Sequence, residues 1–465
     1  MTHRPFAAAP VARSPWRRAL GVALAGVALA AAVAWTPLDA AVAPPKLQYQ
    51  RFTLPNGLTV ILHEDRSTPI AHVQIWYHVG SKNERPGRTG FAHLFEHMMF
   101  KGSKNVEGEQ HTSIVSSVGG RANAYTNEDA TVYWNTVPAQ YLPLVLWMEA
   151  DRLGSLNVDE QTFVNEREVV KEERRMRIDN QPFGNLNELL YQHAFTTHPY
   201  KNPVIGSMAD LDAATIQDVR QFFDTYYIPA NATVVIAGDF DVADTRELVT
   251  RYFGRIPPGA GKVPRDIPQE TKPVREKRVT LEEAWPLPAV IVAQHITYDG
   301  HPDSYPMHVL AKVLSDGNSS RIYRSLVYEK GLAVAAFGGA NLIEHPNLFY
   351  TVAIVNPGQS LDEVEKALVA ELDRAVATGI TDRELQRAKN QFARDYILGR
   401  ETVQQKAGVL AHAEVLHADI TTADGEFAIF QNMTRADVQR VAKTYFTPES
   451  RVVLHVQPKA PGTRP

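Results

Sequence analysis

The chain of 465 residues contains no cysteine. This absence excludes a disulfide framework, cysteine-ligated zinc, iron–sulfur clusters, a thiol nucleophile and lipid attachment through cysteine. Any bound metal must therefore use histidine, aspartate or glutamate. The chain also lacks a large excess of one charge, because 48 Lys and Arg residues stand against 52 Asp and Glu residues, for a formal net charge of −4. Without a broad basic field, we expect no nucleic acid partner.

Long apolar runs are scarce, and the only pronounced one lies near the N-terminus. Three arginines within positions 13–18 precede an apolar run from Ala19 to Trp35, and small residues follow up to Ala43. This order predicts a secretory signal peptide over residues 1–43 and hence a periplasmic location. An uncleaved membrane anchor is the alternative, because the run is just long enough to span a bilayer. We expect no stable membrane span once the signal is cleaved.

One pattern occurs twice in the remaining chain. Residues 214–239 and 434–456 each read as a helix that is closed by a proline and followed by an apolar strand. Pro229 and Pro448 lie 219 positions apart, and this offset indicates an internal duplication. Each half also opens with strand-like segments, at 51–54 and 58–62 in one and at 277–281 and 289–293 in the other.

A proline-rich stretch separates the two halves. Residues 257–276 contain five prolines and are typical of an extended, fairly stiff linker. The expected organisation is an N-terminal domain over 44–256, this linker, and a homologous C-terminal domain over 277–460. Strands and long helices in each half predict an α+β fold of two α/β-sandwich halves, each a mainly antiparallel sheet with helices packed on one face.

A short helical segment of the first half carries the clearest chemical signal. In the sequence FAHLFEHMM at 91–99, His93 and His97 are one helical turn apart and face the same side. Two imidazoles at this spacing can share a metal ion, and Glu96 is placed to act as general base on a water at that metal. The order His-x-x-Glu-His is that of the inverted zincins. Two solvated or helix-capping histidines are the alternative interpretation.

A hydrolytic zinc usually has three protein ligands and one position for water, so a third ligand is needed. The segment 166–176 reads as a helix rich in carboxylates, on which Glu166 and Glu173 share one face. A salt-bridged surface helix would have the same charge pattern. From the pattern alone, the two glutamates are therefore candidates.

These residues resemble the pitrilysin/insulinase family of zinc peptidases, in its short bacterial and mitochondrial-processing-peptidase-like branch. The distance of 76 positions from His97 to Glu173 is part of the likeness. Further motifs in the same order extend it over nearly the whole chain after the signal segment. They occur at Phe52–Val60, Phe100–Ser103, Gly119–Thr126, Asp129–Tyr133, Glu149–Arg152 and His198–Gly206.

The resemblance implies a role for each candidate. His93, His97 and Glu173 would bind one zinc ion per chain, Glu96 would be the catalytic base, and Glu166 would orient a ligand from behind. Asn123 and Ala124 would lie on an edge strand that pairs with an extended peptide substrate. The domain over 44–256 would be the zinc-binding peptidase domain, and the domain over 277–460 its inactive homologue.

The second half matches the family at Ser319–Leu326 and Lys330–Ala333 but departs from it at two positions. Self-contained members of the family carry an Arg and a Tyr there, which bind the substrate carbonyl and stabilise the oxyanion. Val327 and Val334 stand at these positions, and a hydrocarbon cannot donate a hydrogen bond. The expected remedy is a homologous partner chain that supplies Arg and Tyr. A homodimer, or a self-sufficient enzyme that uses Tyr328, is the alternative.

The expected function is a zinc-dependent endopeptidase that hydrolyses short or unfolded peptides, as the catalytic subunit of a two-chain assembly. Two other classes remain open, a non-catalytic scaffold and a peptide-binding module without turnover. The complete set of ligands and base argues against the scaffold. The two valines would suit a chain that holds peptides without cutting them. Manganese or cobalt in place of zinc also stays open.

Overall fold

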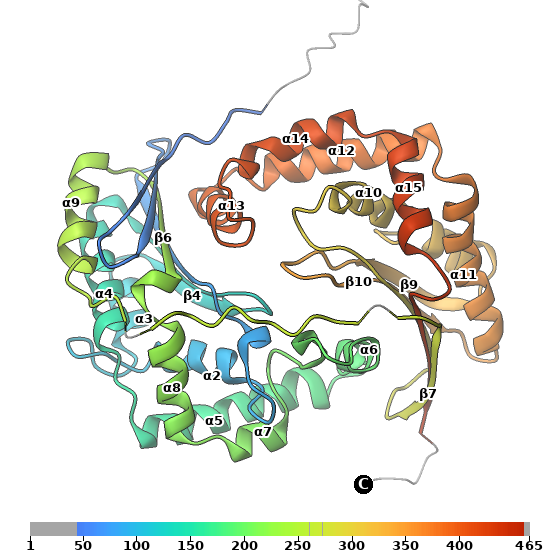
Figure 1. Ribbon diagram of the computed structural model, residues 1–465, viewed down its shortest axis with the longest axis horizontal. Coiled ribbons are helices and arrows are strands. Elements are labelled where there is room, and N and C mark those ends of the chain that lie inside the picture. Colours follow the sequence, from blue (N-terminus) through green and yellow to red (C-terminus); the bar gives the residue numbers. More distant parts are fainter. Residues whose placement is uncertain (1–43, 260, 272, 460–465) are drawn as a thin grey trace, which may run out of the picture. The chain divides into compact units, whose positions relative to one another are not determined.

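The computed structural model describes residues 44–259, 261–271 and 273–459. The predicted signal segment, residues 1–43, lies outside the described residues. From Lys46 onward the chain forms one compact unit that contains two β-sheets (Figure 1). Among the described residues, no helix combines the length and the apolar character that a membrane crossing requires.

The first half builds a six-stranded sheet in the order β1-β2-β6-β3-β5-β4. All neighbours are antiparallel except β2 and β6, which are parallel. The strand β4 is at one edge of this sheet and pairs only with β5. The strands are β1 Gln50–Thr53, β2 Thr59–Glu64, β3 Ile70–Tyr77, β4 Arg121–Thr126, β5 Thr131–Pro138 and β6 Ala232–Gly238.

The second half repeats this topology in a five-stranded sheet of order β7-β11-β8-β10-β9. Its β7 and β11 are parallel and its other neighbours antiparallel, as in the run β2-β6-β3-β5-β4 of the first sheet. The edge strand β1 alone has no counterpart. The predicted fold class is therefore confirmed, with one parallel pair in each sheet. The strands are β7 Lys277–Glu283, β8 Ala289–His295, β9 Ala333–Ala340, β10 Leu348–Val355 and β11 Arg451–Pro458.

The duplicated sequence pattern corresponds to one helix–strand unit in each half. The helices α8 and α15 both begin with a reciprocal capping box, in which a threonine and the aspartate three residues later exchange hydrogen bonds. These pairs are Thr215 with Asp218 and Thr434 with Asp437, so the cap recurs at the same offset of 219. Each helix is then followed by the apolar strand that enters the middle of its sheet, β6 or β11.

The helices of each half cover one face of its own sheet and enclose a separate apolar core there. In the first half they are α2 Phe91–Met98, α3 Gln110–Ser117, α4 Leu142–Ser155, α5 Glu160–Arg174, α7 Met208–Ala213, α8 Ile216–Tyr226 and α9 Val242–Phe253. In the second half they are α10 Ser304–Leu314, α11 Leu361–Thr378, α12 Asp382–Leu398, α14 Thr422–Asn432 and α15 Arg435–Tyr445. Two π-helical turns, η3 Arg175–Asp179 and η6 Tyr323–Glu329, follow α5 and precede β9. Between α9 and β7 the described residues form neither helix nor strand.

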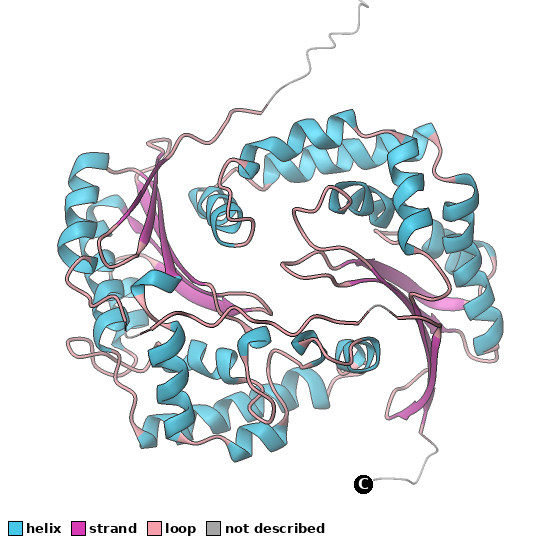
Figure 2. Ribbon diagram, viewed as in Figure 1, coloured by secondary structure: helices cyan, strands magenta, loops and turns pink. Residues whose placement is uncertain are grey.

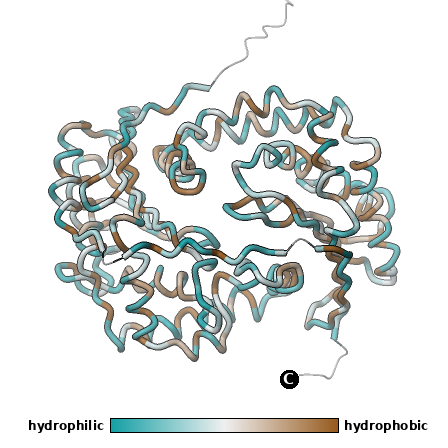
Figure 3. Tube along the Cα trace, viewed as in Figure 1, coloured by the Kyte–Doolittle hydropathy of each residue, from teal (hydrophilic) through white to brown (hydrophobic). Residues whose placement is uncertain are grey.

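The opposite face of each sheet is covered by a helix from the other half. The helix α13, Val403–Val415, packs on β3 and β6 of the first sheet, and its Ala407 and Leu410 belong to one apolar cluster with Ile61 of β2 and Val235 of β6. In return, α6, Leu186–Ala194, packs on β8 and β11 of the second sheet. Figure 2 shows helices on both sides of each sheet, and Figure 3 shows α13 largely in apolar colours. This exchange joins both halves into one unit, and domain limits at 256 and 277 stay predictions.

Shortening a side chain in this exchanged contact should destabilise the whole unit. Leu410 is completely buried between α13 and the first sheet, so Leu410→Ala leaves a cavity and should lower the free energy of unfolding by about 2–5 kcal/mol. The matched control is Leu398→Ala at the end of α12, where the leucine is 45% exposed, and its effect should be within about 0.5 kcal/mol. Urea unfolding followed by circular dichroism measures both, and equal effects would contradict the exchanged packing.

Candidate metal centre

The helix α2 carries apolar and polar residues on different sides. Its polar side presents His93, Glu96 and His97, which are partly exposed. Its apolar side packs into the core of the first half through Phe91, Leu94, Phe95 and Met98. The burial of the apolar side therefore fixes the direction in which both imidazoles point.

The start of α2 is set by the tight surroundings of Gly90 and by one buried carboxylate. Gly90 has a left-handed backbone conformation with φ of 88°, and a Cβ atom there would lie only 2.7 Å from the carbonyl oxygen of Ile205. Glu84 accepts hydrogen bonds from the backbone N–H groups of Gly90 and Ala92, at 2.9 and 2.8 Å. Burial raises the pKa of Glu84 to about 8, although these N–H groups oppose the shift. The glutamate thereby anchors the first turn of the helix that carries the histidines.

The helix α5 lies against α2 and brings the predicted carboxylates to the histidines. Phe163 and Val170 are fully buried in the core of the first half. Glu166 and Glu173 follow at helical spacing on the same side of α5, so the packing of that side also directs both glutamates toward α2. Val169, on the neighbouring side, is exposed.

The structure brings together the three predicted ligands, His93, His97 and Glu173. The Oε2 atom of Glu173 lies 3.7 Å from Nε2 of His93 and 3.3 Å from Nε2 of His97. The two imidazole rings are 4.9 Å apart and almost perpendicular, at 81°. One donor atom from each residue lies within 4.8 Å of the others. When ligand atoms each lie about 2.0–2.1 Å from a tetrahedral zinc, the distances between one ligand atom and the next resemble the donor–donor distances found here. This donor set therefore fits the metal.

Neighbouring charges hold the outer atoms of these ligands. Oε2 of Glu166 lies 3.5 Å from Nδ1 of His97, the ring nitrogen that does not face Glu173, and Lys101 Nζ lies 3.1 Å from the other Glu166 oxygen. Burial acts to raise the pKa of Glu166, but His97 and Lys101 outweigh it and lower that pKa, so the carboxylate stays ionised. Arg177 contacts Oε1 of Glu173 at 2.7 Å and leaves Oε2 to face the histidines. Lys101 belongs to the motif Phe100–Ser103, but its contact with Glu166 was not predicted, and Arg177 had no signal in the sequence.

Glu96 is beside the three ligands and is held by a neighbour from the sheet. Thr126 on β4 donates a hydrogen bond from its hydroxyl to Oε2 of Glu96 at 2.6 Å. Burial raises the pKa of Glu96, and the Thr126 hydrogen bond partly opposes this. Thr126 belongs to a motif noted in the sequence, but its contact with Glu96 was not foreseen.

A groove of about 740 Å³ runs past these residues and along the strand β4. Both predicted substrate-binding residues, Asn123 and Ala124, line it together with His93, Glu96 and His97. The backbone N–H of Ala124 donates to the side chain of Asn123 at 2.9 Å, not to the partner strand β5. The outer edge of β4 therefore presents a backbone donor that a small side-chain rotation would release.

A second cavity of about 570 Å³ shares His93, Thr126 and Glu173 with the groove and extends to the second half at Gly339–Asn341 and Tyr350. The positions at which the family pattern fails are elsewhere. Val334 is 46% exposed at a bulge where the register of β9 and β10 shifts. Val327 is half-buried in η6, and the neighbouring Tyr328 is 84% exposed. None of these three residues lines either cavity.

A buried cluster of charges beside the site joins the two halves. Lys82 Nζ lies 2.9 Å from Asp129 Oδ1 and also pairs with Glu344 of the second half. Asp129 accepts further hydrogen bonds from the Tyr200 hydroxyl at 2.6 Å and from the Glu344 backbone N–H at 3.0 Å. Asp129 and Tyr200 occur in motifs of the sequence, whereas Lys82 and Glu344 carried no signal. The cluster fixes the β4–β5 turn, and with it the end of β4, against the second half.

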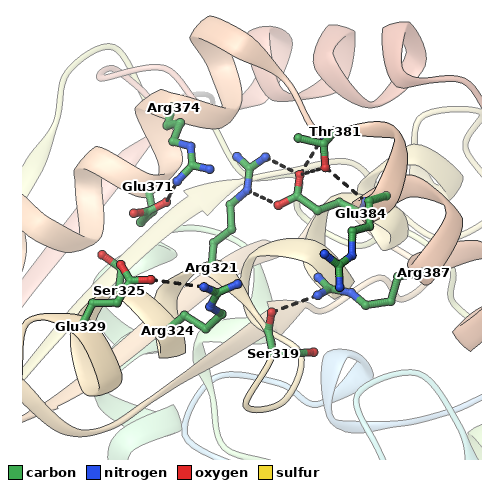
Figure 4. A pocket seen from close by; sticks show the side chains of 11 residues that line it. Ser319, Arg321, Arg324, Ser325, Glu329, Glu371, Arg374, Thr381, Glu384 and Arg387 are labelled. Carbon is green, nitrogen blue, oxygen red and sulfur yellow. Dashed lines mark hydrogen bonds and ion pairs between the residues drawn. The ribbon is translucent and has the colours of Figure 1, made fainter.

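The pocket drawn in Figure 4 has a different character and lies wholly in the second half. Arg321 forms two hydrogen bonds of 2.7 Å with Glu384 of α12 and one with the Gly379 carbonyl. The Ser319–Leu326 motif thus ties η6 to the start of α12. Arginines and glutamates that mostly pair with each other line this pocket.

Comparison with known proteins agrees with this geometry. The profile named Insulinase (Peptidase family M16) matches residues 59–208, and the profile of the Peptidase M16 inactive domain matches residues 213–392. The zinc protease PqqE of Helicobacter pylori is 32% identical over 420 residues, which cover 88% of this chain and 93% of that protein. The chain belongs to peptidase family M16. It is a zinc protease of this family.

Other M16 proteins extend the comparison. An uncharacterised zinc protease of Streptomyces coelicolor is 28% identical, over 85% of this chain and 86% of that protein. The crystal structure of a protease from Helicobacter pylori superposes with a TM-score of 0.85 at 31% identity and covers 89% of this chain and all of that one. The first half of the periplasmic protease PqqL from Escherichia coli shares the fold, with a TM-score of 0.72 at 17% identity, 90% of this chain and 93% of that one.

The position of Glu166 behind His97 yields a prediction for this M16 site. Glu166→Gln keeps the size of the side chain but removes the charge that holds the outer nitrogen of His97, so zinc affinity should fall about 10–100-fold. The control is Glu168→Gln, an exposed glutamate on the same helix, which should leave the affinity unchanged. Competition with a chromophoric chelator measures both. Equal affinity of the Glu166 variant and the unmodified protein would disprove this role.

Proposed function

We propose that this M16 protease is an endopeptidase for short or unfolded peptides, with zinc bound by His93, His97 and Glu173 and with Glu96 as general base. The observation that carries the proposal is the convergence of these three donors from α2 and α5, with Glu96 adjacent, in a groove bordered by a free strand edge. Zinc at this position would polarise the peptide carbonyl and acidify the attacking water. We propose one such zinc ion per chain.

The chain's own residues would handle the proton. Glu96 would accept a proton from the attacking water and deliver it to the leaving amine. Its pKa is raised by burial, which makes its conjugate acid easier to form and to hold until the amine departs. The Thr126 hydroxyl occupies one oxygen of Glu96 and leaves the other for this transfer.

The strand edge supports an extended substrate. A peptide that pairs with β4 would replace the side chain of Asn123 at the Ala124 backbone N–H and run through the groove past Glu96. Such pairing recognises backbone in extended form, so segments already folded into helices or internal strands would not fit. Short or unfolded peptides are therefore the substrate class we propose.

The roles of Glu96 and His93 can be separated by measuring zinc and turnover in the same sample. Glu96→Gln should retain all zinc and lose about 10²–10⁴-fold in peptide cleavage, because only proton transfer is removed. His93→Ala should lose one zinc equivalent and the cleavage together. The measurement is chelator-sensitive cleavage of an unstructured peptide library, made in the presence of the homologous partner chain proposed below where the chain alone does not cleave, with zinc quantified by mass spectrometry. Near-normal turnover of the Glu96 variant would refute the proposed base.

We further propose that a homologous partner chain completes the active site. The support is that Val327 and Val334 cannot donate hydrogen bonds and that neither lines the cavities around the three ligands. A partner carrying Arg and Tyr at the equivalent positions would supply donors to the oxyanion, which are worth about 10²–10³ in rate each. A homodimer is the second possibility, with donors from elsewhere in the chain.

The partner proposal predicts a zinc-loaded chain that is inactive alone. Cleavage should appear when a homologous chain with the Arg and Tyr is added. It should not appear when those two residues of the added chain are replaced by Leu and Phe, which keep the size but remove the donors. Ordinary turnover by the purified chain alone would contradict the proposal, and turnover that rises with its concentration would favour the homodimer.

A periplasmic location is proposed on two grounds. The first is the charged, apolar and small-residue order of segment 1–43. The second is the fold shared with a periplasmic protease of Escherichia coli. If the segment is not cleaved, it would anchor the chain to the membrane.

A further inference from the structure

A second group of metal-type ligands lies in the second half, outside the site described above. It consists of Asp299 in the loop after β8, His412 on α13 and His417 just after α13. Oδ2 of Asp299 lies 2.9 Å from Nε2 of His417 and 3.4 Å from Nε2 of His412. As at the first site, one donor atom from each residue lies within 4.8 Å of the others.

The two groups share their geometry closely. The rings of His412 and His417 are 5.0 Å apart at 82°, compared with 4.9 Å and 81° for His93 and His97. In each group, a single carboxylate oxygen faces the Nε2 atoms of both rings. Two imidazoles and a carboxylate form a donor set that suits zinc and related divalent transition metals.

The orientation of His417 in the second group is also fixed by a hydrogen bond at its outer ring nitrogen. Nδ1 of His417 lies 2.9 Å from the Thr422 hydroxyl, which fixes the ring so that Nε2 faces Asp299. The ring covers Gly300, where a Cβ atom would lie 3.3 Å from it. The side chain of His417 is only 7% exposed. This orientation through the outer nitrogen is the arrangement that metal-ligating histidines commonly show.

Two further ionisable groups are near enough to this cluster to interact with it electrostatically. Glu426 on α14 is close enough for Asp299 and His417 to influence its ionisation, and His308 on α10 is close enough for Asp299 to do so. The cluster itself consists of two imidazoles and one carboxylate in a partly buried place. A divalent cation there would offset the charge of Asp299, and a water would be available as the fourth ligand.

We propose that Asp299, His412 and His417 bind a second divalent metal ion, of the zinc class, with a structural role. It would tie the loop after β8 to the end of α13, the helix that covers the first sheet. This inference is independent of the catalytic proposal, because none of its three residues lines the groove at His93. It raises the expected zinc content from one to two per chain. A plain hydrogen-bonded Asp299–His417 pair without metal is the competing explanation.

Zinc content of the full chain tests the proposal directly. After zinc loading and dialysis against a weak chelator, the unmodified protein should hold two equivalents by mass spectrometry. His412→Ala should hold one, His93→Ala one, and the double variant none. His301→Ala is the matched control, because His301 is in the same loop as Asp299 but outside the group, and it should keep two equivalents.

A stability measurement adds a readout independent of catalysis. In the His93→Ala background, a strong chelator should lower the melting temperature, and it should have no effect once His412→Ala is added. Asp299→Asn should behave like His412→Ala, which guards against an effect peculiar to one variant. If a variant does not fold, anomalous diffraction at the zinc edge from crystals of the unmodified protein gives the answer without any substitution.

The outcomes separate the two metal sites. One equivalent that disappears entirely in His93→Ala would overturn the second site and leave the catalytic proposal intact. One equivalent that survives in His93→Ala but disappears in His412→Ala would overturn the catalytic zinc site and leave the second site intact. Two equivalents retained by both His412→Ala and Asp299→Asn would also overturn the proposal, as would zinc-edge density confined to His93, His97 and Glu173.

Discussion

The packing of α5 across α2 is the interaction on which the candidate metal centre depends. The side of α5 that buries Phe163 and Val170 is also the side that carries Glu166 and Glu173. Burial of each large apolar side chain contributes about 1.5–3 kcal/mol to stability. This contribution offsets the free-energy cost of placing the carboxylates. Crowded carboxylates and imidazoles would otherwise be costly to bring together. Lys101 and Arg177 relieve part of that cost on the outer side, and a metal ion would relieve it on the inner side.

The two halves share a topology but differ in the side chains that they carry. Both have the strand order with one parallel pair, and in both a helix follows the second strand of the repeated sheet, α2 after β3 and α10 after β8. The helix α2 carries two histidines and a glutamate, whereas His308 is the only histidine or carboxylate residue on α10. The second half instead contributes the surface around Asn341 and Tyr350 to the cavity next to the metal centre. The second proposed metal site lies at the end of α13, so it is not a remnant of the first.

The sequence was sufficient for features that depend on local spacing. The pair His93 and His97 follows from one helical turn, and the duplicated helix–strand units follow from a repeated helix pattern that is closed by a proline. Glu173 needed the family resemblance, because its helix pattern also fits a solvated surface helix. Contacts such as Lys82 with Glu344 could not be predicted, since 262 positions separate the partners and neither stands in a motif.

The same limit applied to the exchanged helices and to the second group of ligands. An apolar stripe on α13 predicts that the helix is buried, but it does not tell which of two similar sheets it covers. Asp299, His412 and His417 have no spacing that resembles a metal motif, and only the fold brings them together. Tertiary placement, and not local preference, decided each of these cases.

The exchange of α6 and α13 also determines when the enzyme can become complete. During synthesis the ligands of the metal centre are all present once α5 has been made, yet one face of their sheet stays uncovered until residues 403–415 follow. An interrupted chain would therefore carry all the candidate metal ligands and an exposed apolar face, the usual mark by which proteases and chaperones recognise unfinished proteins. The first sheet is therefore covered on both faces only when the chain has been made almost to its end.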